Sequence, residues 1–391
     1  MRILQTGDWH LGHSNDKHDR SDDLFAQVQR ICDLTQERKV DVLLVAGDVF
    51  ERRRRVDEMT KRLADMLKSY VQQGLHVILV PGNHDDREHF RMMRSLLNLE
   101  KGQPEGQMTQ GQVHIIQTRE IVKIDGVQFA IIPYPIAEAL EPYRVDAVGA
   151  GNRNVVLSAA YADLVRLFRE ELQPEAPVVY VMHINVAGVT TPSERELTYD
   201  DDIRLGREDL PLDAAYIALG HIHQAQSIKH PVPCWYAGSI ERLNMGERHD
   251  DKRVLIVDVP SQGHAQVEEV HLDATPFYDI RIPSAKLESL GESYEDIHNA
   301  FIRLHLECKE GDDPVALQHQ ARSLYRRCID VSCSGIGTAL LTATLPECPT
   351  DYRTTVMNHV RETYANASDL SELEVRANQL LQEVVDAAAT N

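Results

Sequence analysis

Short apolar runs rich in β-branched residues recur through the first two thirds of the chain, and sequence typical of helices or turns separates them. The runs lie at residues 3–4, 40–46, 76–80, 129–132, 178–182, 216–219 and 254–259, and Gly, Pro or Asp bounds them. Runs of this length predict strands. Amphipathic helices are expected at about 21–34, with Ser21 as a candidate N-cap, at 56–73, with Gly74 as a natural stop, and at 158–172. The alternation predicts an α/β layered domain with a buried sheet and helices outside.

The pattern changes near residue 270. Residues 275–283 are typical of a strand after a linker, a helix is expected at about 294–303, and a further strand at 339–345. The last forty or so residues are polar and helical in character. We therefore expect three parts: a main domain at 1–270, a small α+β domain at 271–349 and a helical segment at 350–391. A chain of 391 residues is long enough for two or three domains.

Composition limits where the chain can work. Hydrophobic residues at 42% and charged residues at 26% are typical of a soluble globular protein. No apolar run approaches the roughly 18–20 residues that span a bilayer, and because candidate chemistry begins at Asp8 we expect no cleaved signal peptide. Six scattered cysteines predict free thiols in a reducing cytoplasm. Cys328 and Cys333 are close enough to leave a metal or redox pair open as an alternative.

The net charge of the chain limits which partners its surface can bind. The formal net charge of −20 argues against a general nucleic-acid-binding surface. The acidic residues are unevenly spread, however, and some of them can neutralise bound metal. A local basic run, Arg52, Arg53, Arg54 and Arg55, can contact phosphates at the mouth of a cleft, although such runs are commonly solvated faces.

Polar residues with metal-binding side chains directly follow five of the predicted strands. The carboxyl ends of the strands in an open α/β sheet form one crevice, so these residues are expected to converge although they are far apart in sequence. Glycines precede four of them, at positions 7, 47, 82 and 220, where a tight turn and a close backbone approach are expected. The residues are Asp8, His10, Asp48, Asn83, His84, His183, His221 and His223.

These residue types indicate the metal chemistry. Imidazole, carboxylate and amide ligands suit Mn²⁺, Fe²⁺ or Zn²⁺ better than Ca²⁺, and the absence of thiolates argues against a structural zinc site. Seven candidate ligands, with His84 left aside, are too many for one tetrahedral ion, whereas two ions that share a bridging carboxylate would use them all. Two metals about 3.5–4 Å apart stabilise both the attacking and the leaving oxygen of a displacement at phosphorus. The sequence therefore predicts a two-metal phosphoesterase.

The motifs follow a fixed order: Asp8-Trp9-His10, Gly47-Asp48, Gly82-Asn83-His84-Asp85, a lone His183, and Gly220-His221-Ile222-His223. In this order they resemble the signature of the calcineurin-like metallophosphoesterases. Four details are similar to the SbcD-type DNA repair exonucleases within that superfamily. They are Asp-Trp-His-Leu-Gly at 8–12, Gly-Asp-Val-Phe at 47–50, Gly-Asn-His-Asp at 82–85 and Tyr-Ala-Gly-Ser-Ile-Glu at 236–241. The resemblance covers residues 1–260 well and the remainder by architecture alone.

The resemblance implies a layered β-sandwich flanked by helices, with a smaller α+β capping domain and a helical C-terminal segment. It also implies that two divalent ions, with Mn²⁺ expected and Fe²⁺, Zn²⁺ or Mg²⁺ as alternatives, activate a water that attacks phosphorus. His84 would stabilise the transition state or protonate the leaving oxygen. In the implied ligand set, Asp8, His10 and His223 hold one metal, Asn83, His183 and His221 hold the other, and Asp48 bridges them.

One departure from the superfamily is informative. The phosphoprotein phosphatases read GDxxDRG, and their second Asp orients the catalytic histidine. Here Glu51 takes that position and no Gly follows the next Arg. We infer that Glu51 accepts a hydrogen bond from His84, and we regard a protein phosphatase as disfavoured. His13 is left open as a cleft or surface residue, and Asp85 is expected to orient its own loop.

The resemblance implies a cytoplasmic, Mn²⁺-dependent DNA exo/endonuclease that works with an SbcC-type, SMC-like ATPase through helices at 350–391. A homodimer is expected through the helix that carries Met92, Met93, Leu96 and Leu97, and the small domain would orient DNA. Two alternatives stay open. A phosphodiesterase for small nucleotides or other small phosphodiesters fits the negative charge, and a non-catalytic scaffold with a folding metal site is disfavoured by the presence of the non-ligand His84.

Overall fold

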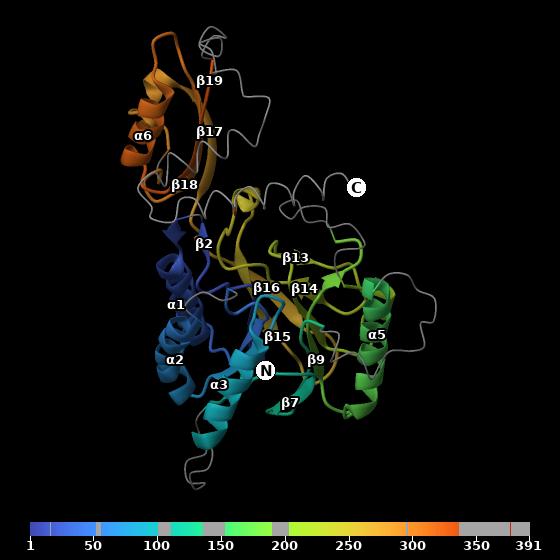
Figure 1. The fold of residues 1–391 in the computed structure, drawn as a ribbon. Coiled ribbons are helices and arrows are strands. Elements are labelled where there is room, and N and C mark those ends of the chain that lie inside the picture. The colour runs from blue at the N-terminus through green and yellow to red at the C-terminus, as the bar shows by residue number, and fades with distance from the viewer. Residues whose placement is uncertain are drawn as a thin grey trace.

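The computed structural model describes residues 1–15, 17–51, 56–100, 111–135, 153–189, 203–294 and 296–335, together with Arg376. Two six-stranded sheets pack face to face in these residues (Figure 1). The first sheet contains, in spatial order, β16 (Gln266–His271), β15 (Arg253–Asp258), β1 (Arg2–Thr6), β4 (Val42–Ala46), β5 (His76–Val80) and β6 (Val113–Ile115). The second contains β13 (Gln226–Ser227), β14 (Cys234–Tyr236), β12 (Tyr216–Gly220), β9 (Val178–His183), β8 (Val127–Ile132) and β7 (Glu120–Ile124).

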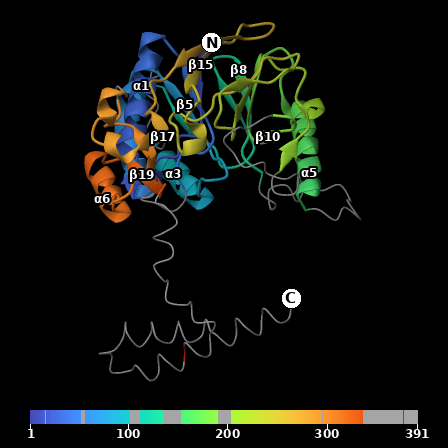
Figure 2. The same cartoon turned by 90° about the horizontal axis from the view of Figure 1, so that it is seen from above.

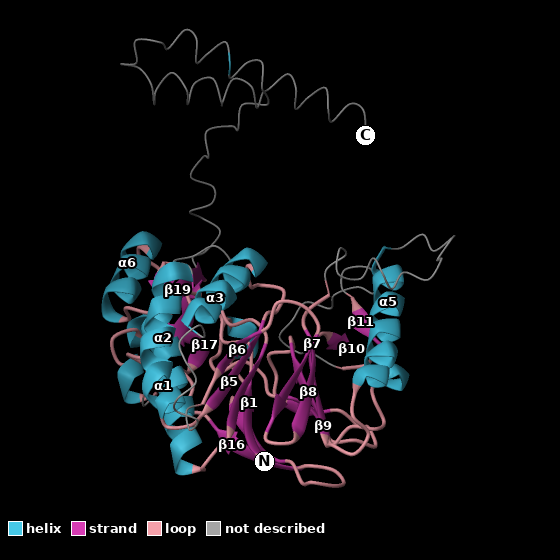
Figure 3. Ribbon diagram, turned by 90° about the horizontal axis from the view of Figure 1, so that it is seen from below, coloured by secondary structure: helices cyan, strands magenta, loops and turns pink. Residues whose placement is uncertain are grey.

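Helices cover the outer faces of both sheets. Figures 2 and 3 show α1 (Ser21–Glu37), α2 (Val56–Gln72) and α3 (Arg87–Glu100) beside the first sheet. On the far side, α5 (Arg153–Phe168) lies beside the second. The layer order is therefore helix, sheet, sheet, helix. Two short strand pairs complete this part: β2 (Ser14–Asn15) with β3 (His18–Asp19), and β10 (Asn185–Val186) with β11 (Arg204–Leu205).

The apolar runs are continuous because each central strand is buried on both faces. In β4, Leu43 and Val45 pack toward the helices, whereas the alternate positions, such as Leu44, pack toward the second sheet. In β9, Tyr180 packs toward α5 and Val181 toward the first sheet. Successive side chains of a strand point to opposite faces, so a strand between two layers needs apolar residues at every position.

The predicted layered α/β sandwich is confirmed, with corrections. All seven predicted strands form. They divide between two sheets, as the implied β-sandwich requires, and do not form the one open sheet from which the crevice was argued. Ser21 is the first residue of α1 and not its cap: Asp19 Oδ1 accepts hydrogen bonds from the Ser21 backbone N–H at 2.8 Å and from its hydroxyl at 2.5 Å. The third predicted helix begins earlier than expected, at Arg153, and its α-helical part ends at Phe168.

A small parallel sheet follows the sandwich. It contains β17 (Phe277–Pro283), β18 (Phe301–Glu307) and β19 (Cys328–Ser334), covered by α6 (Pro314–Leu324), and has its own apolar core. The helix expected at 294–303 is wrong, because Ile302, Leu304 and Leu306 alternate with period two and form β18. The helix lies later in the chain, where Asp313 caps α6 and Pro314 occupies its first turn. The strand expected at 339–345 and the segment 350–391, except Arg376, lie outside the described residues, and the proposed domain limits stay predictions.

The cysteines in the described ranges are free thiols: Cys32, Cys234, Cys308, Cys328 and Cys333. Cys328 and Cys333 are five positions apart on β19, so they point to opposite faces of the strand. Their thiols also have different hydrogen-bond partners. The alternative of a metal or redox pair at these two residues therefore has no support in the geometry. Within the same ranges, no helix combines the length and the apolar character that a bilayer-spanning segment needs.

One buried arginine joins the small sheet to the sandwich. The Arg20 side chain is completely buried, donates to Glu241 Oε2 at 2.9 Å and to Asp23 Oδ2 at 2.8 Å, and lies 4.6 Å from the ring centre of Phe301 in β18. Asp23 also accepts two hydrogen bonds from Arg327, just before β19. The start of α1 is thus the point where the two parts are held together.

Arg20→Ala should lower the free energy of unfolding by about 3–5 kcal/mol, because it leaves the buried Glu241 carboxylate without its cation. The control is Arg30→Ala on α1, where an exposed pair with Glu37 should contribute less than about 1 kcal/mol. Urea unfolding followed by circular dichroism measures both values. Equal, small losses in the two variants would contradict the proposed anchor.

Candidate metal centre

Five strands from two sheets deliver the predicted site residues to one edge of the sandwich. Strands β1, β4 and β5 run parallel in the first sheet, and β9 and β12 run parallel in the second. The two sheets meet where His183, the last residue of β9, places Nδ1 2.8 Å from Ala46 O, the last residue of β4. The residues that follow the five strands therefore share one surface although they come from different sheets.

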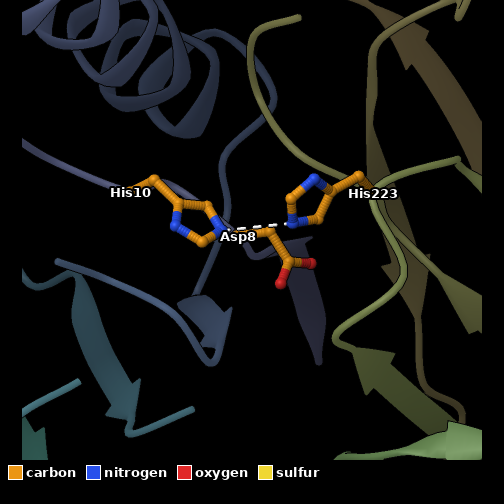
Figure 4. Close-up of side chains that lie close together, drawn as sticks. All are labelled: Asp8, His10 and His223. Atoms are coloured by element: carbon orange, nitrogen blue, oxygen red, sulfur yellow. Dashed lines mark hydrogen bonds between the residues drawn. The ribbon is translucent and has the colours of Figure 1, made fainter. Parts of the chain in front are cut away.

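The first group of donors contains Asp8, His10 and His223 (Figure 4). Their candidate ligand atoms all lie within 4.8 Å of one another. Figure 4 shows the two imidazole rings pointing toward each other, and His10 Nε2 lies 3.1 Å from His223 Nε2. Two ring nitrogens at this distance need a proton or a cation between them, because two lone pairs that face each other would repel.

The second group contains Asn83, His183 and His221. The amide oxygen of Asn83 lies 3.0 Å from His183 Nε2 and 3.0 Å from His221 Nδ1. Asp48 lies between the two groups, with Oδ2 3.3 Å from His183 Nε2 and 3.8 Å from His10 Nε2. The donor chemistry of both groups, imidazole nitrogens with carboxylate and amide oxygens, fits divalent transition metals. Asp48 is placed where a shared ligand would be needed.

Burial strengthens the charge interactions of this centre. Asp48 and His183 are almost completely buried. Burial raises the pKa of Asp48, yet the imidazoles of His183 and His10 outweigh burial and hold this pKa far below its usual range. Burial lowers the pKa of His183 and of His223, but Asp48 raises the first to about 9 and Glu247 raises the second to about 9. Metal binding must displace these protons, so metal affinity is expected to rise with pH.

Backbone strain is concentrated at the same residues. Asp8, His10 and Asp48 have φ angles of 49°, 47° and 48°, and His221 has 101°. They are four of the six non-glycine residues with positive φ in the described ranges. Side chains other than glycine rarely adopt this region, and such strain is typical of functional sites. The backbone is therefore held in place to aim these side chains.

Comparison with known proteins now assigns the family. A sequence model described as calcineurin-like phosphoesterase matches residues 1–225, more than half of the chain. The chain belongs to the calcineurin-like phosphoesterase family. This phosphoesterase is therefore a metal-dependent hydrolase, in a family that uses two divalent metals.

Curated relatives of this phosphoesterase are named as the SbcD component of the nuclease SbcCD. The protein of Bacillus subtilis (strain 168) is 27% identical over 289 residues, which cover 70% of this chain and 70% of the relative. That of Rhodobacter capsulatus is 26% identical over 271 residues, or 66% of each chain. That of Escherichia coli (strain K12) is 27% identical over 315 residues, or 76% of this chain and 75% of the relative.

Glu51 holds three imidazoles of the phosphoesterase. Its Oε1 lies 3.0 Å from His84 Nδ1, and its Oε2 lies 3.2 Å from both His10 Nδ1 and His13 Nδ1. The hydrogen bond to Glu51 raises the pKa of His84, and burial offsets this only in part. The His84 side chain is 41% exposed, and because Glu51 holds Nδ1, Nε2 is the nitrogen that can meet a substrate. His13 thus lies beside the centre, and its Nε2 contacts Leu243 O at 3.1 Å.

Asp85 connects two of the loops that carry donors. Its carboxylate accepts backbone hydrogen bonds from Gly82 at 2.8 Å, Val49 at 3.1 Å and Phe50 at 2.8 Å. It therefore contacts its own loop and also the loop after Asp48. The predicted phosphate-contacting run Arg52–Arg55 lies outside the described residues.

Two parts of the centre carry no signal in the sequence motifs. Tyr134 places its ring centre 5.7 Å from that of His221 and 6.1 Å from that of His183. Glu247 contacts His223 and is completely buried with Lys252. Glu247 lies in a strongly charged stretch, residues 247–253, and such a stretch is typical of a solvated surface. A tertiary contact alone identifies these residues.

The four glycines that precede donors differ in how much space a Cβ would have. A Cβ on Gly220 would lie 1.8 Å from Ala46 O, and one on Gly82 would lie 2.1 Å from Asp48 Oδ1. A Cβ on Gly47 would lie 1.9 Å from His183 Nδ1. Gly7 differs, because a Cβ there would meet Ala46 at 3.5 Å, an ordinary contact. The expected close approach is therefore present at three of the four positions and absent at Gly7.

Gly220→Ala should reduce hydrolysis of bis-p-nitrophenyl phosphate by about 100-fold or more, because it displaces His221 and the Ala46 backbone by the order of an ångström. Gly7→Ala is the matched control, since it also precedes a donor after a strand, and its activity should stay close to wild type. Steady-state kinetics with Mn²⁺, checked against thermal unfolding, measures both. Equal activity of the two variants would contradict the packing argument.

Proposed function

We propose that this phosphoesterase is a DNA exo/endonuclease that hydrolyses phosphodiester bonds with two divalent ions, and that Mn²⁺ is its working metal. The observation that carries the proposal is the convergence of two donor groups on Asp48, next to a half-exposed His84 held by Glu51. The relatives named for the nuclease SbcCD support DNA as the substrate.

Each side chain has a proposed role. Asp8, His10 and His223 would hold one ion, Asn83, His183 and His221 would hold the other, and Asp48 would be shared. Two such ions supply charge stabilisation at phosphorus and lower the pKa of the attacking water. The protein's own contribution is to fix these donors on strained backbone and to exclude water from the buried side of the centre.

His84 is proposed as the proton donor to the leaving oxygen. Its Nδ1 is held by the Glu51 carboxylate, which keeps Nε2 directed outward, and the same contact raises the pKa of His84 and so favours the protonated ring. The His84 backbone N–H also donates to Asp48 Oδ1 at 2.8 Å, so the ring is tied to the shared carboxylate. A positioned, protonated imidazole suits a leaving group that departs as an alkoxide.

The proposed partners follow from the relatives and from the surface. We propose that residues 350–391 bind an SbcC-type, SMC-like ATPase and that the small sheet domain orients DNA over the centre. On α3, Met93 is buried and Leu97 packs against the core of the sandwich. Met92 is 48% exposed and Leu96 is 57% exposed, which supports these two residues as a homodimer contact. The free thiols of the described residues support a reducing, cytoplasmic setting.

A second candidate is a phosphodiesterase that acts on small nucleotides or other small phosphodiesters. The net charge of −20 favours it, because DNA is repelled more strongly than a small substrate on approach to an acidic surface. The same donors and the same His84 would serve this chemistry.

His84→Gln should lower Mn²⁺-dependent cleavage of DNA ends and hairpins by about 10²–10⁴-fold, because the proton donor is lost. Asp48→Ala should abolish cleavage, because both ions lose a ligand. The control is His264→Gln, the same change at an exposed loop residue, which should retain wild-type rates. Cleavage is measured on labelled DNA with and without an added SbcC-type ATPase.

Two outcomes would count against the proposal, each in a different way. Hydrolysis of bis-p-nitrophenyl phosphate without cleavage of any DNA end or hairpin would replace DNA by a small phosphodiester. Wild-type cleavage by His84→Gln and Asp48→Ala would refute the site itself.

A further inference from the structure

Two buried charged residues, Glu247 and Lys252, contact His223 on the side away from His10. Glu247 Oε1 lies 3.0 Å from His223 Nδ1, on the side opposite the nitrogen that faces His10. Lys252 Nζ donates to Glu247 Oε2 at 2.7 Å and to the backbone oxygen of His223 at 3.2 Å. The pair therefore holds both the ring and the main chain of one residue.

We propose that Glu247 and Lys252, together called the His223 clamp, are positioning residues that set the metal-binding form of His223. The proposal rests on the proposed role of His223 as a ligand. A carboxylate can only accept hydrogen bonds, so Glu247 requires the proton of the neutral ring to sit on Nδ1. The lone pair of Nε2 then points toward His10 and Asp8, where the ion would be held.

The orientation of the Glu247 side chain is fixed by further hydrogen bonds. Besides His223 and Lys252, its carboxylate accepts from the Leu243 backbone at 3.1 Å, from Asn244 Nδ2 at 2.9 Å and from Ser239 Oγ at 3.3 Å. Five donors around one completely buried carboxylate fix its orientation. The clamp is thus a rigid support and not a mobile surface contact.

Stability alone does not account for the clamp. Glu247 and Lys252 are 0% and 1% exposed, and an apolar pair of similar volume usually stabilises a core as well as a buried ion pair does. We therefore connect the charged pair with His223, the one imidazole that Glu247 contacts among the described residues. Glu51 differs, because it is shared by His10, His13 and His84.

Glu247→Gln tests the clamp because it keeps the shape and reverses the hydrogen bond. The ammonium of Lys252 would attract the amide oxygen, and the amide N–H₂ group would then face His223 Nδ1. The neutral ring would have to carry its proton on Nε2, where it blocks the metal. The matched control is Asp250→Asn. Asp250 Oδ2 lies 3.3 Å from Lys252 Nζ, so this variant also removes a negative charge beside Lys252. It leaves in place Glu247, the carboxylate that accepts the hydrogen bond from the His223 ring.

The readouts are Mn²⁺ affinity by titration calorimetry and the electron paramagnetic resonance spectrum, both on the chelator-stripped full chain with MnCl₂. Wild type and Asp250→Asn should bind two Mn²⁺ per chain with a spin-coupled spectrum. In Glu247→Gln, one of the two binding steps should weaken by about 10–100-fold and the spectrum should become that of isolated Mn²⁺. His223→Gln should show the same loss.

Three results would overturn the proposal. Wild-type affinity in Glu247→Gln with weakened binding in His223→Gln would refute the clamp while leaving the ligand in place. Wild-type affinity in both variants would remove His223 from the ligand set. An equal loss in Asp250→Asn would show a general effect of charge.

If Glu247→Gln fails to fold, Glu247→Asp replaces it. The shorter side chain keeps the charge beside Lys252 but does not reach His223, so this variant should show the same loss of Mn²⁺ affinity.

Discussion

The close approach of two sheets at Ala46 is the contact on which the centre depends. The Ala46 carbonyl oxygen holds His183 Nδ1 at 2.8 Å, and the space beside it is open only because Gly220 has no Cβ. If the strands could not meet there, the donors of β9 and β12 would be separated from those of β1, β4 and β5. The metal centre therefore requires that the Ala46 and Gly220 backbones pack closely, whatever side chains follow them.

A second constraint is the cost of gathering buried ionisable groups in one place. Each group at the centre has a specific partner: Asp48 has His183, and Asp85 has three backbone N–H groups. Glu51 and Glu247 lie outside the donor groups and hold the far nitrogens of His10 and His223. Carboxylates behind imidazoles fix ring orientation and make the facing nitrogens better ligands.

How much the sequence could predict follows from how local each signal is. The strands and the convergence of the candidate donors were predictable, because a polar residue directly after an apolar run lies at the end of a strand, where such residues meet. The division of the strands between two sheets was implied by the family resemblance and not by the runs themselves, since a run buried on both faces looks the same in one sheet or in two. Strand β18 was mistaken for the end of a helix because its period-two alternation, Ile302, Leu304 and Leu306, is short. Tyr134 and Glu247 reach the centre only through tertiary contacts with His221 and His223.

The central claim is that seven side chains from two sheets hold two ions around Asp48. Anomalous diffraction from crystals grown with MnCl₂ tests it most directly. The account predicts two peaks about 3.5–4 Å apart, one beside Asp8 and His223 and the other beside Asn83, with Asp48 between them. A single peak, or two peaks that do not share Asp48, would contradict it.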